Sequence, residues 1–188
     1  TLIETRAVTR IAHDYGKTYG VGAIIITHGE SDAGNTNYEN DLRKLWNDYN
    51  SDIKAVTGQT QNITMIVSQQ NSTNDRSAST IAQWKAGVDY PDDIVCSGPH
   101  YHFPYSDGTH LTAEGYRLLG EKYGQIYYER VICGRNWQPL QPIGVSRNNS
   151  VITLRFHVPV MPLVWDSLTQ APHQGITEWK NGKGFEVW

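Results

Sequence analysis

Hydrophobic and polar positions follow two different periods over the first 130 or so residues of the chain. Short, almost wholly apolar runs at residues 21–27, 63–67 and 94–96 are typical of parallel strands buried on both faces. Apolar side chains at helical spacing occupy the stretches between and around these runs, at residues 2–12, 38–56, 81–88 and 111–131. This alternation predicts an α/β fold, with a parallel sheet and helices on both of its faces.

The second of these helices carries signals at both ends. Thr36 and Glu39 have the spacing of a capping box, and Gly58 fits the C-terminal stop. On this helix and on the last one, we expect the following side chains to face the core: Tyr38, Leu42, Leu45, Trp46, Tyr49, Ile53, Val56, Tyr116, Leu119, Tyr123 and Ile126.

The pattern changes near Gly134. Residues 151–158 alternate as a half-buried strand does, prolines follow, and residues 185–188 form another short apolar stretch. We therefore expect residues 1–134 to form the α/β domain and residues 135–188 to begin a small β-rich unit.

Composition narrows the function classes. The 188 residues carry a formal net charge of −3, which argues against a basic nucleic-acid-binding protein and against a polybasic membrane patch. The longest apolar run, Ala23 to Ile26, is far shorter than the roughly 20 residues that span a bilayer. Cys96 and Cys133 are too few for a disulfide framework, and the sequence leaves open whether they pair.

The sharpest chemical feature is the segment Asp107-Gly108-Thr109-His110, just ahead of the last helix. A carboxylate and an imidazole three residues apart on a turn can contact each other through Nδ1, so that Nε2 faces outward as a base for a hydroxyl. The spacing alone fits equally well with an ordinary turn followed by a surface histidine.

A second polar loop, residues 27–32, directly follows the first apolar strand. Gly29 allows close approach of the backbone, and His28 or Ser31 could donate a hydrogen bond. Taken alone, this loop is more simply a strand-to-helix connection. Because ligands of parallel sheets bind at the carboxyl ends of the strands, we expect both loops at one edge of the sheet.

Together the two loops resemble a known family. Gly22 to Asp32 is similar to the third sequence block of the SGNH (GDSL-type) hydrolases, above all to carbohydrate acetylesterases and sialate O-acetylesterases, whose strand ends in Gln-Gly-Glu-Ser-Asp. Asp107 to Tyr116 resembles the fifth block. The resemblance covers about residues 1–132 and implies a flavodoxin-like three-layer sheet, present here in part. It also implies a serine esterase that removes O-acetyl groups from a carbohydrate and needs no cofactor.

The resemblance implies roles for individual residues. Asp107 would orient His110, and His110 would be the general base. The loop at His28, Gly29 and Ser31 would bind substrate and the oxyanion. The family has Gln where this chain has His28, and other branches have an Asn whose register falls near Ser31, so the side-chain donor is one of these two.

The chain also departs from the family. The Gly-Asp-Ser or Gly-Gln-Ser block with the nucleophilic serine, and the block with the backbone oxyanion glycine, are missing from the 188 residues. We expect them on a preceding segment or on a companion chain, and we expect the 188 residues alone to be neither stable nor active. The stretch Gly184-Phe185-Glu186 resembles the end of a β-rich unit that follows the hydrolase core in relatives.

Three other interpretations stay open. Gly29-Glu30-Ser31-Asp32-Ala33 is close to the nucleophile elbow of α/β-hydrolases, with Ser31 as nucleophile. His100 and His102, with Asp107 or His110, have elements of a metal site. The chain could also be a non-catalytic carbohydrate-binding fragment that stacks sugars on exposed tryptophans, namely Trp137, Trp165, Trp179 and Trp188.

Location follows from the expected substrate. A polysaccharide esterase favours an extracellular or cell-surface setting, and three triplets, at Asn62, Asn71 and Asn148, fit the glycosylation pattern that also arises by chance.

Overall fold

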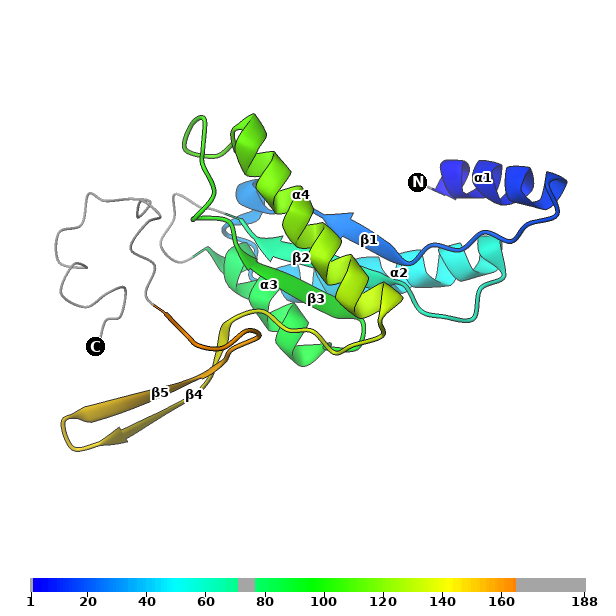
Figure 1. The fold of residues 1–188 in the computed structure, drawn as a ribbon. Coiled ribbons are helices and arrows are strands. Elements are labelled where there is room, and N and C mark those ends of the chain that lie inside the picture. The colour runs from blue at the N-terminus through cyan, green and yellow to red at the C-terminus, as the bar shows by residue number, and fades with distance from the viewer. Residues whose placement is uncertain (1, 71–76, 165–188) are drawn as a thin grey trace.

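The three apolar runs form one parallel sheet. A computed structural model describes residues 2–70 and 77–164 of the chain. Its strands β1 (Ala23–Ile26), β2 (Thr64–Gln69) and β3 (Ile94–Pro99) lie in the order β1-β2-β3, all parallel (Figure 1). The predicted α/β class is confirmed at this level: a three-stranded parallel sheet flanked by helices.

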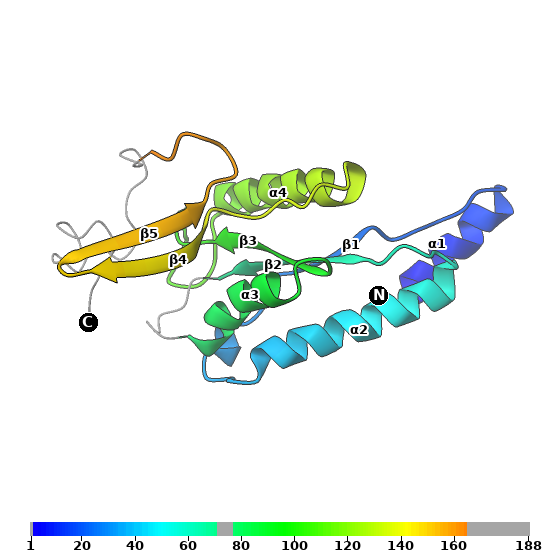
Figure 2. The ribbon, with the colours of Figure 1, turned by 90° about the horizontal axis from the view of Figure 1, so that it is seen from below.

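Helices cover both faces of this sheet. Helices α2 (Tyr38–Thr57) and α3 (Ala78–Asp89) lie on one face and α4 (Ala113–Tyr127) on the other (Figure 2). The alternation of side chains along β2 divides the core: Met65 and Val67 pack with α2 and α3, whereas Ile66 packs with α4. Helix α4 continues into a π-helical turn, η2 (Tyr128–Ile132).

The predicted capping box at the start of α2 is absent, and the predicted end of the helix is confirmed. The N-cap is Asn37, whose backbone N–H donates to the side-chain oxygen of Asn35 at 2.9 Å, and Glu39 pairs with Lys85 instead of closing a capping box with Thr36. At the other end, Gly58 adopts a left-handed φ of 73° and donates its N–H to the Lys54 carbonyl.

Two of the side chains that we expected in the core are exposed. Leu45 is 36% exposed because its neighbour Trp46 takes the inward position and donates its indole N–H to the Ile63 carbonyl. Tyr116 is 49% exposed because Gly115, one position earlier, is the residue that faces the preceding loop.

Strand β1 is less buried than its composition predicts. In the described part of the chain it pairs with β2 alone, so it is an edge strand. Ile25 is 50% exposed, which corrects the expectation of a strand buried on both faces.

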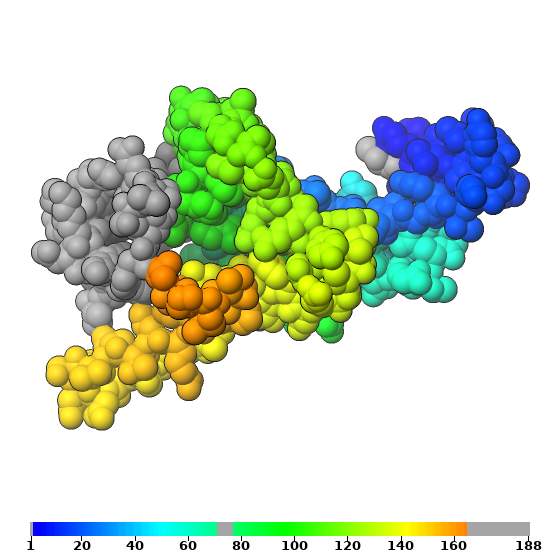
Figure 3. Space-filling view, in the orientation of Figure 1, coloured from blue at the N-terminus to red at the C-terminus, as the bar shows by residue number. Residues whose placement is uncertain are grey.

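The first helix and the C-terminal hairpin extend beyond the sheet and its covering helices on opposite sides (Figure 3). Helix α1 (Leu2–Asp14) packs along α2 and leaves Ile3 and Ile11 exposed. None of the helices in the described ranges has the length and apolarity needed to cross a membrane.

The hairpin consists of β4 (Gln141–Asn148) and β5 (Val151–His157), paired antiparallel. The strand predicted from residue 151 is confirmed, whereas β4 was not predicted. The short stretch at 185–188 lies outside the described residues. Cys96 and Cys133 are free thiols.

Candidate active site

The segment from Asp107 to His110 forms the tip of the β3–α4 connection. An antiparallel bridge between Tyr105 and Leu111 closes the base of this loop, and the Ser106 amide donates to the His110 carbonyl at 2.8 Å. The Thr112 amide donates to the Pro104 carbonyl at 2.9 Å, and the Thr112 hydroxyl then caps α4 by accepting from the Gly115 amide. The loop is therefore fixed to the start of a helix.

Within this loop the expected contact between carboxylate and imidazole is present. Asp107 Oδ2 lies 2.8 Å from His110 Nδ1. Asp107 Oδ1 accepts from the backbone amides of Thr109 (2.7 Å) and His110 (2.6 Å). Because one oxygen holds the turn and the other meets the ring, the carboxylate fixes both the backbone and the imidazole.

This geometry shifts the pKa values of both side chains. The amide and ring N–H groups of His110, together with the Thr109 amide, lower the pKa of Asp107 to about 2. In return, the hydrogen bond to Asp107 and its negative charge raise the pKa of His110 above its usual value. The His110 and Asp107 side chains are 69% and 55% exposed, so both face solvent. Residues 2–70 and 77–164 offer His110 Nε2 no hydrogen bond.

The second loop leaves the carboxyl end of β1 and is held by side chains from two helices. The His28 carbonyl accepts from Gln83 Nε2 (2.6 Å) and from the Tyr38 hydroxyl (3.0 Å), and the Gly29 carbonyl accepts from the Ser79 hydroxyl (2.8 Å). A short 3₁₀ turn, η1 (Glu30–Asp32), follows. The loop is therefore anchored in large part through its backbone carbonyls, and the His28 ring adds a contact with the Tyr38 hydroxyl.

Sequence reasoning missed these anchors. Tyr38 was expected only as a core residue of its helix, and Gln83 and Ser79 were not singled out. The available signal was Gln83, a long amide side chain buried on a helix whose other buried positions, Ser79, Ala82 and Ala86, are small.

Gly29 is required by its surroundings. Its φ is 124°, and a Cβ at this position would lie 2.1 Å from Gln70 Nε2 and 2.8 Å from the Tyr38 hydroxyl. We expect Gly29→Ala to lower the free energy of unfolding by about 2–4 kcal/mol, from backbone strain and overpacking together. Urea denaturation measures this change. Gly34→Ala is the matched control, because a Cβ at Gly34 meets open space. An equal loss of unfolding free energy in the two variants would show that a side chain at position 29 is neither strained nor crowded.

The His28 ring is held by the Tyr38 hydroxyl. This hydroxyl lies 3.0 Å from both His28 Nδ1 and the His28 carbonyl oxygen. Burial raises the pKa of Tyr38 to about 12, so the hydroxyl keeps its single proton. Donation of that proton to the carbonyl makes the hydroxyl oxygen an acceptor for an Nδ1 proton, whereas donation to Nδ1 leaves the ring proton on Nε2.

Ser31 lies in the middle of η1, is exposed, and has a negative φ. The elbow interpretation requires a strained turn that runs directly into a helix, but α2 begins only at Tyr38. No hydrogen bond joins Ser31 to His110 within the described ranges.

The two loops lie at the same edge of the sheet, because β1 and β3 are parallel and both loops follow carboxyl ends. They are linked electrostatically: the Glu30 carboxylate is among the groups that raise the pKa of His110. They share no hydrogen bond among residues that the structure describes.

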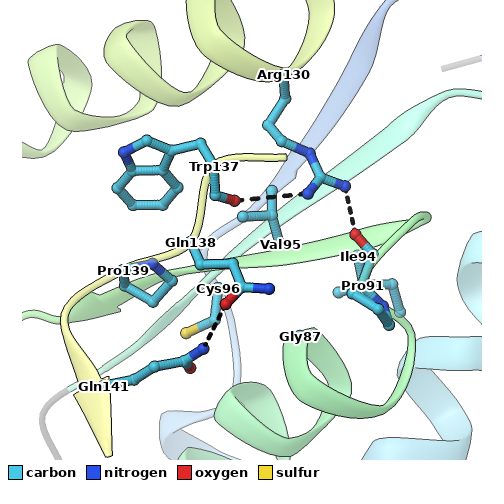
Figure 4. Close-up of a pocket in the computed structure, with 10 residues that line it drawn as sticks. All are labelled: Gly87, Pro91, Ile94, Val95, Cys96, Arg130, Trp137, Gln138, Pro139 and Gln141. Atoms are coloured by element: carbon cyan, nitrogen blue, oxygen red, sulfur yellow. Dashed lines mark hydrogen bonds between the residues drawn. The ribbon is translucent and has the colours of Figure 1, made fainter. Parts of the chain in front are cut away.

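A small pocket near Pro91 lies away from this edge, toward the amino end of β3 (Figure 4). Arg130 crosses it and donates to the carbonyls of Pro91 and Trp137, while Gln141 donates to Gln138 at 3.3 Å. These contacts fasten the chain after α4 onto the sheet, so the pocket is a packing seam.

The described residues offer little support for the metal-site interpretation and for the carbohydrate-binding interpretation. His100 is buried beside Phe103, and burial lowers its pKa to about 4; across the described residues no three His, Cys, Asp or Glu side chains gather to hold a metal ion. Trp137, expected to be exposed, packs against the α4 core under the Lys122 ammonium. Trp165, Trp179 and Trp188 lie outside the described residues.

Comparisons of this chain with family models, with curated proteins and with solved structures find no match.

Proposed function

We propose that this chain supplies the acid–base pair and the oxyanion loop of an SGNH-type serine esterase that removes O-acetyl groups from a carbohydrate. One observation supports this above the others: Asp107 holds the His110 ring at Nδ1 while two backbone amides hold Asp107. This arrangement leaves Nε2 as the basic nitrogen of the ring. It also stabilises the imidazolium that forms when Nε2 takes a proton.

The arrangement of the elements is compatible with this proposal. A flavodoxin-like sheet consists of parallel strands with helices on both of its faces, and its ligand site lies at the carboxyl ends of the strands. Strands β1 to β3 with α2, α3 and α4 fit a part of such a sheet. The choice of an acetylated carbohydrate comes from the resemblance of residues 22–32 to the acetylesterases.

The reaction would proceed through an acyl-enzyme. His110 Nε2 takes the proton of a seryl hydroxyl as its oxygen attacks the acetyl carbonyl, and then returns that proton to the sugar oxygen as the ester bond breaks. Water, activated by the same nitrogen, releases acetate and regenerates the hydroxyl. We propose that the seryl group comes from outside these 188 residues.

Of the two candidate oxyanion donors, we propose Ser31. Its exposed hydroxyl always carries a proton that it can donate, whereas a proton on Nδ1 of neutral His28 would face the Tyr38 hydroxyl. We expect Ser31→Ala to lower the turnover of an acetyl ester by about 10²-fold or more. His28→Ala should change turnover far less. The reverse order of the two effects would assign the donor to His28.

The proposal is tested by labelling the intact gene product, meaning the polypeptide as its source makes it, with a fluorophosphonate. Peptide mapping should find the label on a seryl group outside residues 1–188, and pre-labelling should abolish the release of acetate from an O-acetylated polysaccharide. Label on Ser31 would move the nucleophile to the elbow. An unlabelled, inactive protein would overturn the esterase proposal.

A further inference from the structure

A groove of about 540 Å³ lies between α1 and the last turns of α2, a volume typical of small-molecule sites. The two helices run side by side there (Figures 1 and 2). Because α2 ends at Thr57, before β2 begins, the groove lies toward the amino ends of the strands. It is therefore remote from the His28 and His110 loops, which lie at the carboxyl ends. The groove lining includes cationic, hydrogen-bonding and apolar side chains, namely Arg6, Thr9, Arg10, Asp52, Ala55 and Val56.

The two arginines of this groove lack a partner of opposite charge. Arg6 and Arg10 are exposed, and their guanidinium groups form no hydrogen bond or ion pair with residues 2–70 and 77–164. By contrast, Arg43, Arg117 and Arg135 each pair with a carboxylate. Because Arg6 and Arg10 are four positions apart on one helix, their like charges lie side by side and destabilise it. An anion bound between the two guanidinium groups would offset that repulsion.

The other side chains of the groove narrow the kind of anion. The Thr9 hydroxyl donates to the Thr5 carbonyl at 2.7 Å, so its oxygen is left as an acceptor. The Asp52 carboxylate is a second acceptor, since it forms no hydrogen bond or ion pair within the described ranges. Ala55 and Val56 add an apolar surface.

A ligand that uses all of these groups needs a negative group for the arginines, hydroxyl donors for the two acceptors and an apolar face. A sugar acid has all three. A fully ionised inorganic anion has only the first, and the Asp52 carboxylate would repel it.

We infer that the groove between α1 and α2 binds a uronic acid residue of an acidic polysaccharide. Its carboxylate lies on Arg6 and Arg10, whose planar guanidinium groups match a carboxylate with two parallel hydrogen bonds. Its hydroxyl groups donate to Asp52 and Thr9. Binding at this groove requires no catalytic activity, so it is independent of the proposed esterase reaction. A polysaccharide held here and at a second point stays at a high local concentration.

Calorimetric titration of the intact gene product at low ionic strength tests the kind of ligand. The three probes are trigalacturonate, its trimethyl ester and sodium sulfate. The ester keeps the sugar rings and removes their charge, whereas sulfate keeps the charge without a sugar. Trigalacturonate should bind at least about 10-fold more tightly than either of the others. Equal affinity for the acid and its ester, or no binding of the acid, would overturn the inference. Sulfate binding as tight as that of trigalacturonate would reduce the groove to a bare anion site and overturn the sugar-acid assignment.

Three variants test the location of the site. Arg6→Gln and Arg10→Gln should each weaken trigalacturonate binding by about 10-fold or more, because each removes a charge and a pair of donors. Glutamine is a good helix former, so α1 should persist, and circular dichroism checks this. Arg147→Gln is the matched control, since it removes the same charge from an exposed arginine on β4. It should bind like the unsubstituted protein. Equal weakening in all three variants would show an effect of net charge alone, and unchanged affinity in both groove variants would place the ligand elsewhere; either result would overturn the inference.

Discussion

Replacing His110 by alanine is expected to lower the turnover of acetyl esters by the intact protein about 10⁴-fold, because no other described group can take the seryl proton at that position. Within the described residues the ring makes one hydrogen bond, to Asp107 Oδ2, and it is exposed, so its loss should leave the fold unchanged. Initial rates of acetate release, with circular dichroism as a check on folding, measure the effect.

His13→Ala is the matched control, since His13 is an exposed histidine on α1, away from the carboxyl edge of the sheet. It should retain full activity. Equal rates in the two variants would remove His110 from the mechanism.

The pH profile gives a second measure of the same residue. A general base must be neutral, and Asp107 raises the pKa of His110 above its usual value. The rising limb of kcat/KM should therefore lie above about pH 6.5, the ordinary histidine pKa, with activity lost as the pH falls below it. A rising limb below that value would contradict the assignment of His110 as the base.

Replacing Asp107 by asparagine should be nearly as damaging, again about 10⁴-fold in turnover, through the tautomer. The amide oxygen can keep the two backbone hydrogen bonds that Oδ1 now accepts from Thr109 and His110, so the turn should persist. The amide N–H₂ would instead face Nδ1 and favour the proton on Nε2, the nitrogen that must be free to act as a base.

This variant also has a signature in pH. Without the carboxylate, the pKa of His110 should fall, so the rising limb of the residual activity should move to lower pH. Steady-state rates over a pH series measure both effects. Unchanged turnover with an unchanged profile would show that Asp107 does not act through His110.

The parts of the molecule that the sequence predicts well are those fixed by local pattern. Three apolar runs predict three parallel strands, and the Asp107–His110 contact follows from a spacing of three residues around Gly108. The capping box fails because Asn35 offers a competing local acceptor to the start of α2. Strand β4 is missed because it has only Ile143 and Val145 as alternating apolar residues and contains Pro142 and Gly144, which are disfavoured in strands.

The less predictable parts depend on partners distant in sequence. The carbonyl of His28 meets the Gln83 amide 55 positions later, and nothing local to either residue indicates the pairing. The edge position of β1 is likewise a property of the whole sheet rather than of the run Ala23 to Ile26, whose composition is that of an interior strand.

Side chains of α2 and α3 hold the carbonyls of His28 and Gly29, so the conformation of this loop is set before a ligand binds. A connection held from α2 and α3 already has its shape before any encounter, so little conformational entropy is lost when an acyl group arrives. In the proposed reaction, its dipoles would not need to reorient as negative charge develops on the carbonyl oxygen, and that rigidity would itself contribute to the rate.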